Sequence, residues 1–123
     1  MSFRIEIDAD HSIIEVIYSG NVDFEERLKA VEEVSSIIGE YSEKRLLVDV
    51  RKIEKDMPQN DQAEFGKVLA DKKELRGAKV AVVRRPGELQ NLVVNTVATS
   101  RGYRIAEFES KKEAFPWLVG SVK

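Results

Sequence analysis

The chain has 123 residues, of which 42% are hydrophobic and 34% charged, and its formal net charge at pH 7 is −2. We expect a single domain over residues 1–123, because a chain of this length can bury enough apolar surface to fold by itself. The lack of cysteine excludes disulfides, thiolate catalysis and cysteine-ligated metals, and the weak negative charge argues against a nucleic-acid partner. The opening stretch MSFRIEID lacks the apolar run of a signal peptide, and no segment approaches the ~20 apolar residues of a membrane span. The sequence therefore predicts a cytoplasmic protein.

Two strands open the chain. Polar and apolar residues alternate from Phe3 to Asp8, and a more apolar run follows from Ile13 to Gly20. A break as short as the one between them is typical of an antiparallel hairpin. The half-polar first strand is therefore expected at an edge of the sheet.

Strands and helices alternate over the rest of the chain. Further strands are predicted at residues 46–50, 80–83 and 103–108. Helices are predicted after Asp23, from residue 60 or 61 to 76, over the run containing Leu89, Leu92, Val93 and Val97, and after Ser110, where Pro116 should kink or shorten the last one. The order is ββαβαβαβα, and right-handed crossovers make strands two to five parallel. The predicted fold is a single-domain α/β protein with a mixed sheet of five strands and four helices.

Ligands of open α/β sheets bind beyond the carboxyl ends of the parallel strands. Two segments there carry the candidate binding residues, which are Arg51, Lys52, Asp56, Met57, Asn60, Arg84, Arg85 and Gly87. Two arginines beside a helix that opens at Pro86 could hold a carboxylate or phosphate. The alternative is that these arginines are solvated loop charges, partly neutralised by Glu88.

Nothing in the sequence forms a catalytic or metal-binding constellation. His11 is the single histidine and lies in the predicted hairpin turn. Asp49 lies near a strand end, like the phospho-accepting aspartate of a response-regulator receiver domain. The further acidic residues and the lysine that such a domain requires are not in place, so Asp49 is expected to bind a backbone group or Arg51. We therefore assign no catalytic residue, metal ligand or cofactor, and we expect a protein that is not an enzyme.

With this order of elements, the chain resembles the STAS-like superfamily of bacterial anti-sigma-factor antagonists and their relatives, in particular its SpoIIAA-like branch. The resemblance spans nearly the whole chain and rests on the initial hairpin and on the segments RLLVDVRKI, AKVAVVRRPGELQNLV and YRIAEFESKKEAFPWL. In the regulatory antagonists, a serine in the loop after the third strand is phosphorylated by a partner kinase. Here the loop from Lys52 to Asp61 contains no serine or threonine, so that phospho-switch does not carry over.

Three functions follow as hypotheses. The leading one is a non-catalytic binding or regulatory module, monomeric or homodimeric, that contacts a protein partner or a small anionic ligand at the carboxyl ends of the strands. Relatives of this fold have been linked to lipid and nucleotide binding, so the resemblance also implies a carrier or sensor of a small amphipathic molecule, with peripheral contact to lipid. Met57 and Phe65 are the candidates to line its pocket, although apolar residues at helical spacing belong to the core more often than to a pocket. A third hypothesis is a small hydrolase or transferase in which Arg84 or Arg85 holds an anionic substrate and Asp49 or Asp56 is the base.

Overall fold

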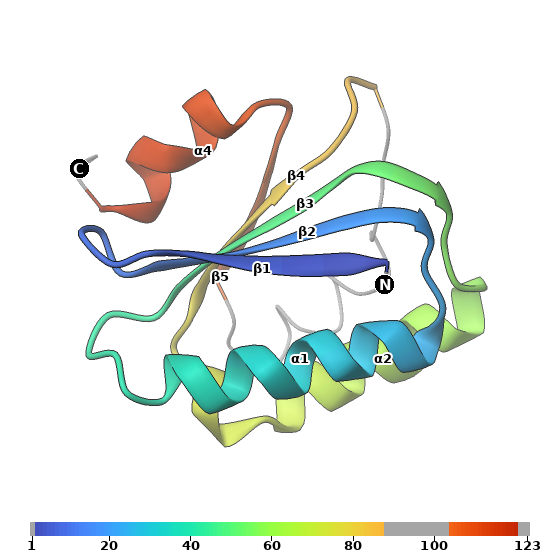
Figure 1. Ribbon diagram of the computed structural model, residues 1–123, viewed down its shortest axis with the longest axis horizontal. Helices are drawn as coiled ribbons and strands as arrows, with labels where there is room; N and C mark the ends of the chain where they lie inside the picture. Colours follow the sequence, from blue (N-terminus) through green and yellow to red (C-terminus); the bar gives the residue numbers. More distant parts are fainter. Residues whose placement is uncertain (1, 88–103, 121–123) are drawn as a thin grey trace.

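A five-stranded sheet forms the centre of the molecule (Figure 1). The computed structural model describes residues 2–87 and 104–120. The strands lie side by side in chain order and are β1 (Phe3–Asp8), β2 (Ile13–Asn21), β3 (Arg45–Lys55), β4 (Lys79–Val83) and β5 (Arg104–Phe108). β1 is antiparallel to β2 and lies at the edge of the sheet, and all the other neighbours are parallel. The predicted strand directions are confirmed.

Helices cover both faces of this sheet. α1 (Phe24–Ile38) and α2 (Gln59–Asp71) lie on one face and α4 (Lys111–Leu118) lies on the other (Figure 1). The side chains of Asp23 and Ser110 cap α1 and α4 by accepting from the backbone N–H groups of Glu26 and Glu113, as their spacing predicted. The described residues hold three α-helices where four were expected, and the helix expected around Leu89 to Val97 lies outside them.

Two apolar clusters hold these layers together. The larger one lies between the sheet and the helices α1 and α2, and the smaller one lies between the sheet and α4 (Figure 1). Leu46 and Leu47 show the division, because these adjacent residues of β3 point to opposite faces and both are buried. Strands buried on both faces explain the near-continuous apolar runs in β3 and β4.

β3 is longer than the sequence predicted. It was expected to end at Val50 and to give way to a charged loop, but it pairs with β2 as far as Lys55. The register slips between Ile17 and Ser19 of β2, and slips again between Gly20 and Asn21, so β3 contains two extra residues. Such bulges break the two-residue alternation on which a strand is recognised, and they place both Val50 and Ile53 in the larger cluster.

The second helix is shorter than predicted. α2 ends at Asp71, and a 3-10 turn, η1 (Lys73–Leu75), replaces the last turn of the expected helix up to Arg76. Gly77 then adopts a φ of 79°, a conformation that glycine reaches without strain, and this turn leads the chain into β4. Pro116 lies inside α4, which spans 8 residues.

Candidate functional site

The two segments predicted to bind a ligand lie at the same edge of the sheet. We call this region the carboxyl edge and define it as residues 51–60 and 84–87. Its two halves touch, because Nη1 of Arg85 donates to the carbonyl oxygen of Arg51 at 3.1 Å. Arg51 and Lys52 belong to β3 and not to a loop, and Gly87 has a φ of 80° in the turn after β4.

Arg84 is paired with carboxylates of the neighbouring strand and the residues after it. Its Nε donates to Oε1 of Glu107 at 2.7 Å, and its Nη1 lies 3.5 Å from Oε2 of Glu109. The hydrogen bond that Arg84 donates to Glu107 raises the pKa of Arg84 further above its usual value. The guanidinium thus already has two anionic neighbours within the chain.

Arg85 bonds to the backbone of β3. Its two terminal nitrogens donate to the carbonyl oxygens of Arg51 and Ile53, each at 3.1 Å. β4 pairs with β3 only as far as Val83 opposite Asp49, so β4 does not reach these two carbonyls. The Arg85 guanidinium therefore takes the place of a neighbouring strand along the end of β3.

Asp49 is bound as the sequence predicted. It is 2% exposed, and it accepts hydrogen bonds from the backbone N–H of Arg51 at 3.1 Å and from its guanidinium at 3.0 and 2.9 Å. Burial alone would raise the pKa of Asp49, but the hydrogen bonds from Arg51 outweigh it and lower that pKa below its usual value. The Lys111 ammonium, which forms an ion pair with Glu15, lies 3.9 Å away. Asp49 is thus an ionised group in a paired cluster under α4.

Asp56 anchors the loop of the carboxyl edge to α1. Its Oδ2 accepts from Nη2 of Arg27 at 2.7 Å, and its Oδ1 accepts from the N–H of Met57 at 2.8 Å. The Arg27 side chain is 3% exposed and that of Asp56 is 13% exposed. An ion pair with so little exposure fixes the position of the loop relative to the helix.

Arg27 is the functional candidate that the sequence reasoning missed. It lies on the apolar side of α1, three residues after Phe24 and four before Val31, so helical spacing alone could have identified it as a buried charge. Its guanidinium carbon lies 4.9 Å from the centre of the Tyr18 ring and 5.5 Å from that of Phe65. Burial raises the pKa of Tyr18 to about 12.

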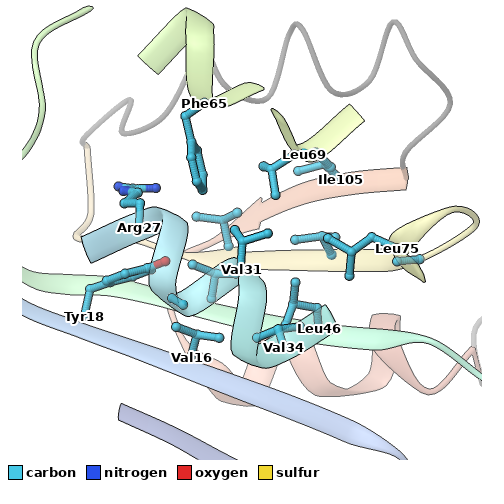
Figure 2. A pocket seen from close by; sticks show the side chains of 15 residues that line it. Val16, Tyr18, Arg27, Val31, Val34, Leu46, Phe65, Leu69, Leu75 and Ile105 are labelled. Atoms are coloured by element: carbon cyan, nitrogen blue, oxygen red, sulfur yellow. The ribbon is translucent and has the colours of Figure 1, made fainter. Parts of the chain in front are cut away.

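An apolar cavity of about 60 Å³ begins at Arg27 and extends between the sheet, α1 and α2. Figure 2 shows Arg27 between Tyr18 and Phe65 at one end of this cavity, with apolar side chains along its length. Nε of Arg27 is buried and has no hydrogen-bond partner among the described residues. Phe65, one of the two candidates for a pocket, lines the cavity and also belongs to the larger apolar cluster. Met57, which is 4% exposed, belongs to the surrounding apolar cluster and does not line it.

Lys52 and Asn60 are the exposed polar members of the predicted set. Neither side chain hydrogen-bonds to another residue in the part of the chain that the structure describes. Within residues 2–87 and 104–120, no group of three or more histidine, aspartate or glutamate residues is arranged to hold a metal ion. No helix within these ranges is long and apolar enough to cross a membrane.

Two solved structures share this architecture. One is an uncharacterised protein of the DUF3478 family with a SpoIIAA-like fold, from Shewanella loihica PV-4, at 20% identity and a TM-score of 0.61 over 94% of this chain and 91% of that one. The other is the anti-sigma factor antagonist SpoIIAA in its unphosphorylated form, at 15% identity and a TM-score of 0.63 over 96% of this chain and 98% of that one. The chain has a SpoIIAA-like fold, as the sequence predicted. No protein-family model matches it, and no curated protein does.

Proposed function

We propose that this chain is a non-catalytic regulatory module of the STAS type that binds a protein partner through its carboxyl edge. The fold supports the class by analogy, because the similar structure of SpoIIAA is that of an anti-sigma factor antagonist, a protein that acts on another protein. Fold alone does not supply a binding surface, so the proposal depends on the residues at this edge.

The observation that carries the proposal is a fixed loop between β3 and α2, two elements that each carry an exposed polar side chain near it. The Arg27–Asp56 pair and the hydrogen bond from Gln62 to the Met57 carbonyl hold the loop in place. Lys52 of β3 and Asn60 of α2 are both exposed to solvent. A surface that is ordered before binding loses less conformational entropy when a partner arrives.

A protein partner fits this edge better than a small anion. Arg84 is occupied by Glu107 and Glu109, and Arg85 by two carbonyl oxygens, so a small anion would have to displace existing hydrogen bonds. A protein can contact the exposed residues without breaking these bonds. The same pairing disfavours a hydrolase or transferase that would hold its substrate through Arg84 or Arg85.

Photo-crosslinking tests the proposal. A photoreactive amino acid is placed at position 52 or 60 of the full chain, and at position 29, an exposed lysine of α1, as a control. We expect a discrete protein adduct in cells from positions 52 and 60 and none from position 29. The absence of an adduct from both edge positions, or equal adducts from position 29, would overturn the proposal.

A second candidate function is the binding of a small amphipathic molecule in the apolar cavity. The specific observation is the unpartnered Nε of Arg27 at the end of an apolar space, which offers one donor to an acidic head group. A shift in melting temperature with fatty acids, lost when Val31→Phe fills the cavity, would support it. If fatty acids shift the melting temperatures of the wild type and of Val31→Phe equally, this cavity is not their binding site.

A further inference from the structure

A polar hollow of about 510 Å³ lies at the opposite edge of the sheet, where the parallel strands begin. Its walls come from the loop before β3, the turn between η1 and β4, the start of β5 and the end of α4. The hollow is remote from the carboxyl edge, since each parallel strand runs its full length between the two.

Positive charge is concentrated in this hollow. Five of its lining residues are cationic, namely Lys44, Arg45, Arg76, Lys79 and Arg104, and Glu43 is the one carboxylate among the described residues that line it. The chain as a whole contains 20 lysines and arginines against 22 acidic residues, so this local excess runs against the overall charge. A concave surface lined by one sign of charge focuses its field on a ligand of the opposite sign.

Two of the five cations have a structural role. Arg45 donates to the carbonyl oxygens of His11 at 2.6 Å and of Val119 at 3.5 Å. The Lys79 ammonium donates to the carbonyl oxygen of Trp117 and lies 4.8 Å from the centre of its ring. Cations at a helix C-terminus satisfy carbonyl groups that have no partner within the helix, so Arg45 and Lys79 hold the end of α4.

The other three cations are not explained by contacts within the fold. The side chains of Lys44 and Arg76 form no hydrogen bond or ion pair with residues 2–87 or 104–120 in the structure. Arg104 donates from Nη2 to the carbonyl oxygen of Gly77 at 3.2 Å, and its other side-chain nitrogens have no partner in that part of the chain. Like charges gathered around a hollow repel one another, and a bound anion relieves that repulsion.

We propose that this hollow binds a small polyanion, a molecule that carries two or more phosphate or carboxylate groups. Guanidinium groups bind the oxygens of such groups in pairs, and the two available arginines come from different walls of the hollow. Its concave shape suits a small molecule better than a membrane surface or a duplex. The proposal is independent of the partner proposed for the carboxyl edge.

Calorimetry on the full chain at ~0.15 M salt tests this site, with tripolyphosphate, ATP and citrate as probes. The test variant is Arg76→Ala/Arg104→Ala. The matched control is Lys67→Ala/Lys112→Ala, which removes the same charge from exposed positions of α2 and α4 outside the hollow. We expect at least one probe to bind the wild type, with a loss of tenfold or more in the test variant and of less than twofold in the control.

The pattern of probes identifies the ligand chemistry. Equal binding of tripolyphosphate and ATP indicates recognition of the phosphate chain, binding of ATP alone indicates a nucleotide, and binding of citrate indicates clustered carboxylates. The proposal is wrong if none of the three binds, or if both variants weaken binding equally. Circular dichroism of each variant checks that the substitutions leave the chain folded. As a further control, Lys52→Ala/Asn60→Ala, which changes the carboxyl edge, should bind the probe like the wild type.

Discussion

The two charged residues that are buried in the described part of the chain each form an ion pair with a residue of opposite charge. Arg27 and Asp49 are both 2% exposed, and each contacts a counter-ion at less than 3 Å. Helical spacing could have identified Arg27 as buried. The sequence analysis expected Asp49 to bind a backbone group or Arg51, and it accepts from both the backbone N–H and the guanidinium of Arg51. The partner of Arg27, by contrast, is 29 residues away, a contact that local patterns do not encode.

Replacement of Arg27 measures what its ion pair contributes. Arg27→Met keeps much of the side-chain volume between Tyr18 and Phe65 but leaves Asp56 without its cation. Removing one partner of a buried pair costs about 3–5 kcal/mol, and the 13% exposure of the Asp56 side chain places the expected loss near 3 kcal/mol. Urea denaturation of the two proteins measures this difference in the free energy of unfolding.

The double variant Arg27→Met/Asp56→Asn is the control for this experiment. It removes the charge that the single variant leaves unpaired, so we expect it to be more stable than Arg27→Met. Equal losses in the two variants would mean that packing of the Arg27 side chain, and not the ion pair, stabilises this part of the fold.

At the level of elements, β3 shows where sequence reasoning succeeded and where it could not. Alternation and capping residues predicted the hairpin and the starts of α1 and α4, and the long crossover connections predicted the parallel strands. The extension of β3 from Arg51 to Lys55 was missed, because two extra residues in its pairing with β2 disturb the alternation. Arg84 and Arg85 were predicted to bind an anionic ligand, with solvated loop charges as the alternative, and the pairing of both within the chain was not foreseen. Their bonds to Glu107 and to β3 depend on contacts 23 or more residues apart.

The extension of β3 should depend on Arg85. Arg85→Ala leaves the carbonyl oxygens of Arg51 and Ile53 without their donors, and we expect a loss of about 1–2 kcal/mol in the free energy of unfolding, since water replaces part of each bond. Arg85→Lys should lose nearly as much, because one ammonium cannot reproduce the planar fork that spans two carbonyls. Hydrogen exchange of the amides in residues 51–55 should become faster in both variants.

Lys52→Ala is the matched control on the same strand segment. The Lys52 side chain is exposed, so we expect a change within about 0.5 kcal/mol. If Arg85→Ala is as stable as Lys52→Ala and hydrogen exchange is unchanged, then the contacts with β2 alone hold the end of β3.

At the scale of the whole molecule, one sheet serves two cores. β3 and β4 contribute alternate residues to the cluster under α4 and to the larger cluster on the α1–α2 face. Unfolding of β3 and β4 would therefore expose the apolar residues of both clusters. The same sheet separates two charged edges, one proposed for a protein partner and one for a small polyanion.

Trp117 offers a direct test of this coupling, because it is the only tryptophan and lies on α4, 5.6 Å from the Phe108 ring. If the two cores form one cooperative unit, the loss of Trp117 fluorescence should coincide with the loss of far-ultraviolet circular dichroism during thermal unfolding. Leu118→Ala truncates a side chain that is 1% exposed, so it should cost about 2–5 kcal/mol and lower both midpoints together by roughly 10 °C. A fluorescence transition that precedes the dichroism transition, or that alone moves in Leu118→Ala, would show that α4 detaches before the sheet unfolds. The two cores would then be independent, although they share β3 and β4.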